Sequence, residues 1–279
     1  MNTPARVIFD RSIFHKERFD TLTKSPLSLA IRNGQVKLLY TSIFIEETLM
    51  FSQKRSQEFL DQWRFIVSLN RSHWFKTSQR IFPYELSRRI RSNDFYLLKP
   101  SQIETIIARA PRLTEKNISG NDMKKTLEHV DRNYELRDDE RSRRLALRYD
   151  NPQTNSNFET EFERFAEKFL QVGIMSRYRH SRGYLTAWRE HRSDLKFTDM
   201  YLRSWFSTRF LPVVDHKLKV HKNDRVDAEQ LAYLIWADIF VSDDLGIIPP
   251  AFKLLYPNDD KTLYSSDQFI AFLNTLSVV

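Results

Sequence analysis

Four acidic residues occupy positions at which parallel β-sheet proteins commonly place reactive groups. Asp10 and Asp244 each follow a short apolar run, one near each end of the chain. Asp227 opens a segment with helical character, and Glu47 lies one turn into a helix expected after a second apolar run. Open parallel sheets bind ligands beyond the carboxyl ends of their strands. We therefore expect these four side chains to converge at one edge of a sheet.

Several carboxylates at one site repel each other and raise one another's pKa values. A hard divalent cation removes that repulsion, and Mg²⁺ and Mn²⁺ prefer oxygen ligands. A metal ion held in this way can activate water and stabilise phosphoryl oxygens during attack. The predicted metal ligands are Asp10, Glu47, Asp227 and Asp244, with Asp243 as an alternative to its neighbour.

Each acidic residue also has a purely structural interpretation. Asp10 could end a strand and cap the next helix. Asp227 could be an N-cap, and Gln230 three residues later would complete a capping box. Alternatively, Asp224 caps that helix and Asp227 is a first-turn acid favoured by the helix dipole. Glu47 could lie on a solvated face, and the two adjacent aspartates could form a polar turn.

The apolar runs that precede these acids predict strands, and helical segments separate them. Alternation of strands with helices predicts a three-layer α/β/α fold with a parallel sheet. Thr41 or Ser42 can cap the helix that carries the glutamate. The expected strands cover residues 6–9, 35–40, 239–241 and 262–264, and helices are expected over 227–237 and 267–276.

A long tract between these segments has helical periodicity. Phe59, Trp63 and Ile66 recur at helical spacing, as do Phe162 and Phe165. The sequence therefore predicts a catalytic core formed by residues 1–51 and 223–279. Residues 52–222 form a large α-helical insertion, which could bind nucleic acid or a partner.

Composition excludes several classes of protein. With no cysteine, disulfides and thiolate zinc sites are absent, which suits a reducing cytoplasm. Five glycines are too few for a typical phosphate-binding loop, and no P-loop or dinucleotide motif is present. No apolar run is long enough to span a membrane. The net charge of +8 favours a polyanionic partner such as nucleic acid.

Four short motifs, taken together in this order, resemble those of PIN-domain nucleases. An apolar strand ends in Asp10-Arg11-Ser12, and a helix after the second strand carries Glu46-Glu47. Asp227-Ala228 begins an alanine-containing helix, and a further apolar strand is followed by Ser242-Asp243-Asp244. The resemblance covers residues 1–51 and 223–279, and the long helical tract departs from the compact members of the family.

The resemblance implies a parallel sheet between helices, with an acidic pocket that binds Mg²⁺ or Mn²⁺ and hydrolyses RNA. Ser12 would orient a metal-bound water or a neighbouring carboxylate. Glu47 fits the helix register better than Glu46. Asp244 fits the spacing after Ser242 better than Asp243, which is then expected to be the more exposed of the two.

Basic clusters in the helical tract predict contacts with nucleic acid. Arginine and lysine neutralise phosphates, and the interleaved Tyr178 could stack on an unpaired base. Such clusters can also be solvated faces without a ligand. The predicted contacts are Arg177, Arg179, Arg182, Lys217, Lys219 and Lys222.

The leading interpretation is a cytoplasmic, metal-dependent endoribonuclease. One alternative is a DNA nuclease of a mobile element or defence system. Another is a catalytically inactive PIN scaffold that binds RNA or protein, and a third is a helical interaction module whose acids are caps. An inhibitor protein and a homodimer also remain open as partners.

Overall fold

The computed structural model describes residues 3–52, 56–87, 93–115, 120–128, 157–173, 183–216, 218, 224–258 and 260–276. Within these residues the chain forms an α/β fold around one four-stranded parallel sheet. The strands are β1 (Ala5–Phe9), β2 (Val36–Leu39), β3 (Ile239–Val241) and β4 (Thr262–Tyr264). They lie in the order β2-β1-β3-β4, which confirms the predicted parallel sheet.

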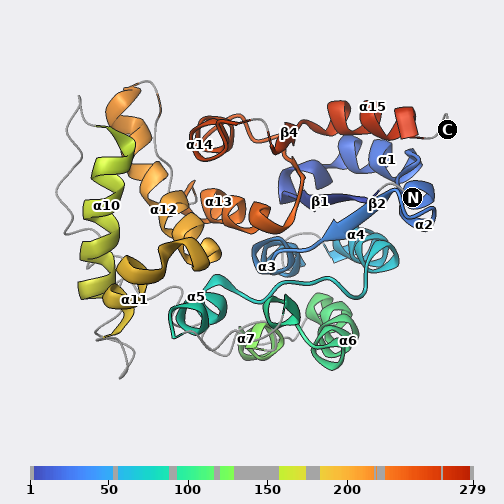
Figure 1. Cartoon of the computed structure of the whole chain (residues 1–279). Coiled ribbons are helices and arrows are strands. Elements are labelled where there is room, and N and C mark those ends of the chain that lie inside the picture. The colour runs from blue at the N-terminus through green and yellow to red at the C-terminus, as the bar shows by residue number, and fades with distance from the viewer. Residues whose placement is uncertain are drawn as a thin grey trace.

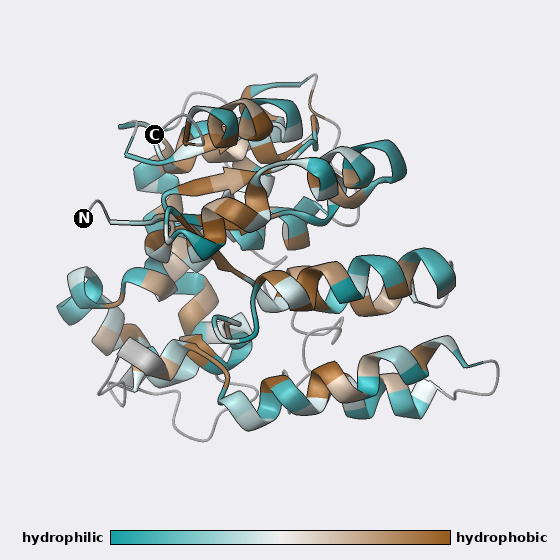
Figure 2. Ribbon diagram, turned by 90° about the vertical axis from the view of Figure 1, so that its right-hand side faces the viewer, coloured by the Kyte–Doolittle hydropathy of each residue, from teal (hydrophilic) through white to brown (hydrophobic). Residues whose placement is uncertain are grey.

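The strands are apolar because both faces of the sheet are covered. Ile8 and Phe240 belong to one hydrophobic core, whereas Val7, Phe9 and Val241 belong to another. Successive side chains of a strand point to opposite faces, so each strand must supply both cores. Figure 2 shows the strands as hydrophobic segments inside the molecule. This two-sided burial explains the continuous apolar runs in the sequence.

One face of the sheet shares a hydrophobic core with the helix over 78–86, with the helices between residues 158 and 214 and with those that flank β3. Figure 1 shows α10, α11 and α12 grouped at one end of the molecule. The helices of this layer are α5 (Ser78–Leu86), α10 (Phe158–Lys168), α11 (Tyr184–His191), α12 (Lys196–Val214), α13 (Asp224–Gln230), the 3₁₀ helix η7 (Leu231–Trp236) and α14 (Ile248–Leu255).

The opposite face packs against the helices near the two ends of the chain and three from the helical tract. In Figure 1, α1, α2 and α15 lie at the end of the molecule away from α10. The elements of this layer are the 3₁₀ helix η1 (Arg11–Phe14), α1 (Lys16–Lys24), α2 (Leu27–Arg32), α3 (Ser42–Phe51), α4 (Ser56–Leu69), α6 (Pro100–Arg109), α7 (Gly120–Glu128) and α15 (Ser266–Leu276).

The described parts of the predicted helical tract are mainly helical and share both cores with the sheet. Phe59 and Trp63 of α4 pack in one core, and Phe162 of α10 packs in the other. Shorter turns join the helices: η2 (Asn93–Tyr96), η3 (Ala110–Thr114), the π-helical turn η4 (Phe169–Gly173) and η6 (Arg192–Asp194). Among the described residues, no helix combines the length and apolar character needed to cross a membrane.

The helix before β3 differs from the prediction at both ends. The sequence predicted one helix over 227–237, but α13 begins at Asp224 and continues as 3₁₀ helix η7 to Trp236. Tightening into 3₁₀ geometry is common at helix ends, and here Ala237 N–H donates to the Leu234 carbonyl at 3.1 Å. The early start places Asp227 in the first turn of α13 rather than at its cap.

The N-terminus of α12 is capped by a side chain from a distant helix. Glu85 of α5 is 5% exposed and accepts hydrogen bonds from Phe197 N–H at 3.2 Å and Thr198 N–H at 2.6 Å. The Thr198 hydroxyl also donates to Glu85 at 2.6 Å. Burial raises the pKa of Glu85, and the hydrogen bonds to Thr198 and Phe197 oppose that shift. This carboxylate therefore joins α5 to the longest described helix.

We expect Glu85→Ala to lower the free energy of unfolding by about 2 kcal/mol, because it leaves buried N–H groups unpaired. Urea unfolding measures this loss. Glu104→Ala is the control, since Glu104 makes an exposed ion pair with Arg71 and its removal should cost less than about 1 kcal/mol. Equal losses in the two variants would contradict the capping role.

Candidate functional site

The predicted acids lie where the order of the strands reverses. The chain passes from β1 to β2 on one side of β1 and later inserts β3 on the other side. Asp10 directly follows β1, and Ser242 to Asp244 directly follow β3. A crevice at such a switch point is where open α/β sheets bind ligands. The two ends of the chain therefore meet at this edge.

Asp10 is held by side chains from three segments. It is 5% exposed, and its Oδ1 accepts a hydrogen bond from Gln230 Nε2 of α13 at 3.0 Å. Its Oδ2 accepts from the hydroxyls of Ser242, at 2.8 Å, and Ser12. The Ser12 hydroxyl also accepts from the backbone N–H of Asp243 at 3.0 Å. Ser12 thus orients a neighbouring carboxylate, and both oxygens of Asp10 are fixed.

Asp227 lies in an electrostatically unfavourable place. Burial raises its pKa to about 7, and the negative charges of Asp10, Asp244 and Asp224 add to the shift. Asp10 follows β1 and Asp244 follows β3, whereas Asp224 shares the first turn of α13 with Asp227. Of the four predicted acids, Asp10 and Asp244 therefore lie near enough to Asp227 for their charges to act on it.

Asp224 joins this group, although the sequence indicated only a capping role for it. It begins α13 and is 7% exposed. Asp224 and Asp227 are three residues apart, a spacing that places side chains on the same face of a helix. That spacing was the available signal in the sequence. The acidic group formed by Asp10, Asp224, Asp227 and Asp244 is called the acidic centre below.

The two adjacent aspartates after β3 have different environments. The side chain of Asp243 is only 7% exposed; its Oδ2 lies 3.2 Å from Arg18 Nε, and its Oδ1 accepts from Ser266 N–H at 2.9 Å. Asp243 was expected to be the more exposed of the two residues, but both are partly buried, and Arg18 and α15 enclose the side chain of Asp243. The negative charge of Asp244 instead acts on Asp227 and raises the pKa of that residue. The Oδ1 atom of Asp244 accepts a hydrogen bond from Gly246 N–H at 2.6 Å.

Glu47 lies close to Arg11, a partly buried arginine whose role the sequence did not indicate. Burial lowers the pKa of Arg11 to about 10, and the charges of Glu47, Glu58 and Asp10 oppose that shift. The Arg11 guanidinium donates to Gln62 Oε1 at 2.5 Å. Glu46, the alternative to Glu47, is 5% exposed. Arg11 therefore balances Glu47 and Asp10 at the boundary of the acidic centre.

The oxygen-rich acidic centre suits Mg²⁺ or Mn²⁺ in its donor chemistry. Within the described parts of the chain, however, no three His, Asp or Glu side chains lie close enough together to hold a metal ion directly. Mg²⁺ usually keeps several of its waters and binds through one or two carboxylates. The centre therefore fits an ion held partly through water.

The predicted nucleic-acid contacts are not placed by the structure. Arg177, Arg179 and Arg182 lie outside the described residues, as do Lys217, Lys219 and Lys222. Their assignment as phosphate contacts stays a prediction.

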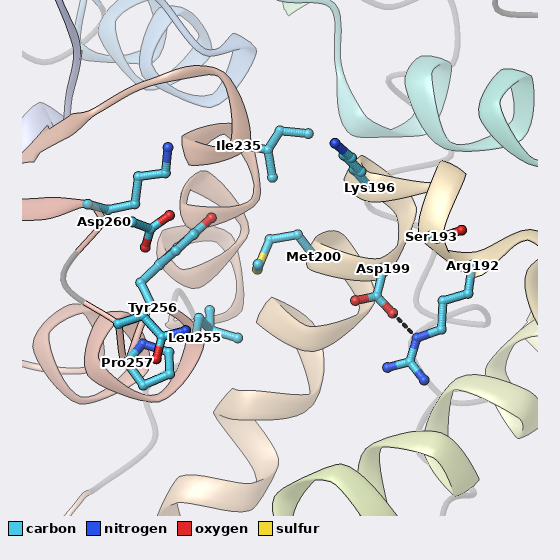
Figure 3. Close-up of a pocket in the computed structure, with 12 residues that line it drawn as sticks. Arg192, Ser193, Lys196, Asp199, Met200, Ile235, Leu255, Tyr256, Pro257 and Asp260 are labelled. Carbon is cyan, nitrogen blue, oxygen red and sulfur yellow. Dashed lines mark hydrogen bonds and ion pairs between the residues drawn. The ribbon is translucent and has the colours of Figure 1, made fainter.

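A cavity of about 700 Å³ lies away from the acidic centre, and Figure 3 shows it between α12, α14 and the segment before β4. Ile235 and Lys261 line it and precede β3 and β4, so it opens at the amino ends of these strands. Arg192 Nε donates to Asp199 in its wall at 2.6 Å. None of the predicted site residues lines this cavity.

Comparisons with protein-family models, with curated proteins and with solved structures found no significant match to this chain.

The raised pKa of Asp227 makes a prediction about stability. A folded-state pKa of about 7 means that unfolding releases a proton between about pH 4 and pH 7, so rising pH destabilises the fold over this window. The full effect above pH 7 is at most about 4 kcal/mol. We expect Asp227→Asn to be about 2 to 4 kcal/mol more stable than the wild type at pH 8 and equal to it at pH 4.

Urea unfolding at the two pH values measures this difference. Asp267→Asn is the matched control, because Asp267 is an exposed first-turn acid of α15. A wild type as stable as Asp227→Asn at pH 8 would show that the carboxylates do not repel each other.

Proposed function

We propose that this protein is a metal-dependent phosphodiesterase of the PIN type that cleaves RNA with Mg²⁺ or Mn²⁺. The observation that carries the proposal is the raised pKa of Asp227 beside Asp10, Asp224 and Asp244 at the switch point of the sheet. A binding scaffold has no need to concentrate negative charge at the edge where ligands bind.

The alternative that these acids are only caps explains part of the arrangement. Asp10 does accept the Ser12 N–H at 3.3 Å, as the cap of η1 would. Capping does not explain why Asp227 is buried near three further carboxylates at a cost in stability. A bound divalent cation would offset this repulsion, which supports a metal site over a set of caps.

Within the proposal, one or two carboxylates of the acidic centre, Asp227 and Asp244 first among them, would hold the metal ion directly, and Asp10 and Asp224 would hold it through water. The chemistry that such an ion supplies is activation of water and stabilisation of phosphoryl oxygens. Ser12, Ser242 and Gln230 keep the Asp10 carboxylate in a fixed orientation.

RNA is the proposed substrate because of the resemblance to PIN-domain nucleases and the net charge of +8. The cleavage assay should include single-stranded RNA and DNA of the same sequence. If the protein cleaves only the DNA strand, its substrate is DNA and not RNA. The absence of cleavage of either, with binding retained, would favour an inactive scaffold.

We expect Asp227→Asn and Asp244→Asn each to lose cleavage by roughly 100-fold or more, since each removes a proposed metal ligand. The measurement is the rate of RNA cleavage in Mn²⁺. These positions are better tests than Asp10, because an amide at Asp10 would disturb three hydrogen bonds and confuse folding with activity. Asp267→Asn at the same sheet edge is the control and should keep its activity.

We also expect Asp243→Asn to remain active but to unfold more easily, because Asp243 pairs with Arg18 and Ser266 instead of facing Asp227. An inactive but stable Asp243→Asn with a normal Asp244→Asn would reverse the assignment of the two residues.

Metal binding itself can be measured without a substrate. A ligand that binds only the folded state raises its stability with concentration. At pH 8 we expect Mg²⁺ or Mn²⁺ to raise the melting temperature of the wild type, and Asp227→Asn to lose most of this response. An equal response in both proteins would place the metal elsewhere.

A further inference from the structure

A cluster of three cations lies on the sheet edge that carries the acidic centre. Residues 73–75 extend the sheet beyond β2: Tyr40 N–H donates to the His73 carbonyl, and Phe75 N–H donates to the Tyr40 carbonyl at 2.8 Å. Because Trp74 pairs in parallel with Tyr40, the chain leaves this pairing at the carboxyl edge of the sheet. Lys76 is the next residue after this extension.

Helix α13 connects the cluster to the acidic centre. The Tyr233 hydroxyl, one turn beyond α13, donates to the Lys76 carbonyl at 3.0 Å. Ser78, at the start of α5, donates to Glu229 of α13. The next residue, Gln230, donates to Asp10. Neighbouring residues of α13 therefore contact Asp10 and Ser78, a residue two positions from Lys76 and from Arg80, and a ligand could extend from the acidic centre to the cluster.

The cluster consists of Lys76, Arg80 of α5 and Lys99, which precedes α6. Burial lowers the pKa of Lys76 to about 8, and the positive charges of Arg80 and Lys99 add to the shift. Among the side chains that the structure describes, no carboxylate forms an ion pair with any of the three. The Nη1 atom of Arg80 is also buried and donates to no described group.

Cations nearer the acidic centre are already engaged by the protein. Arg18 pairs with Asp243, and Arg11 contacts Gln62 and the negative charges around it. Lys76 donates to the Phe95 carbonyl, yet Arg80 and Lys99 still repel it, and an anion between the three cations would offset that repulsion. Phosphate groups suit this role, because they accept hydrogen bonds from both guanidinium and ammonium groups.

Aromatic rings accompany the cations. The Nζ of Lys76 lies 4.0 Å from the centroid of the Phe95 ring, and the ring of Tyr84 lies 4.9 Å from that of Phe95. Tyr84 is 42% exposed and is one helical turn from Arg80 on α5. Unpaired bases stack on such rings, while adjacent cations bind the backbone. An acidic peptide would gain nothing comparable from the rings.

We propose that Lys76, Arg80 and Lys99 form a phosphate-binding site for single-stranded nucleic acid, which holds the strand beside the acidic centre with Tyr84 and Phe95 as stacking surfaces. This assignment rests on the proposed nuclease function for its choice of ligand. It is separate from the contacts predicted at Arg177, Arg179 and Arg182, and each set can be tested alone.

The test is binding of a short single-stranded RNA, measured by fluorescence anisotropy across a salt series in EDTA, so that no cleavage occurs. We expect Arg80→Gln/Lys99→Gln to bind more weakly at low salt. Its slope of log affinity against log salt should flatten by about 1.4, since two phosphate contacts are lost at about 0.7 each. Lys76→Met, which keeps an apolar stem in the half-buried position, should lose about one contact.

The matched control is Lys24→Gln/Lys253→Gln, which removes two exposed lysines from α1 and α14. Its slope should stay close to that of the wild type. Thermal melts check that each variant folds. An unchanged slope in the folded Arg80→Gln/Lys99→Gln variant would overturn the inference, and so would a wild type that binds RNA without salt dependence. Equal binding of poly-glutamate, lost in the same variants, would also overturn it.

Failure of this inference and failure of the proposed function give different results. A wild type that cleaves RNA in Mn²⁺, combined with an unchanged slope in the variants, rejects only the binding site. A flattened slope in the variants, combined with no cleavage by the wild type, supports the binding site and rejects the nuclease. Asp227→Asn should bind RNA in EDTA at least as well as the wild type, because it loses a negative charge near the strand.

Discussion

The parallel pairing of β1 with β3 is the constraint on which the rest of the structure depends. Phe9 lies opposite Val241, and Asp10 N–H donates to the Val241 carbonyl at 2.9 Å. This pairing joins the two ends of the chain and creates the switch point of the sheet. The long tract between β2 and β3 must therefore leave the carboxyl edge with α3 and return to it with α13, so its helices can contribute groups to that edge.

The protein keeps its negative and positive charges apart at this edge of the sheet. The acidic centre has Arg11 and Arg18 at its boundary, yet neither offsets the repulsion on Asp227. Lys76 and Arg80 lie on the other side of α13 from the acidic centre. Neither of these positive charges has a carboxylate partner among the described side chains. Folding alone would favour mixing these charges. Keeping these charges apart lowers the stability of the fold. A ligand that carries both a cation and phosphates would offset this loss.

Local patterns in the sequence were sufficient to predict the sheet and part of the site. Apolar runs gave the four strands, and Thr41 caps α3 through its hydrogen bond with Phe44 N–H at 3.1 Å. The position of Asp10 after its strand followed from the same reasoning. Hydrogen bonds and ion pairs between residues far apart in the sequence could not be predicted from local patterns. Gln230 contacts Asp10, and Glu85 caps α12, only because packing brings those helices together. The burial of Asp243 likewise depends on Arg18, whose position no local pattern fixes.

The origin of the acidic centre from both ends of the chain has a consequence during protein synthesis. Asp10 emerges from the ribosome early, but Asp227 and Asp244 emerge only after the whole helical tract. Contacts between such distant segments form late in folding, because the intervening chain must first be ordered. A nascent chain therefore has no complete acidic centre until the segment with Asp244 has been made and β3 has paired with β1.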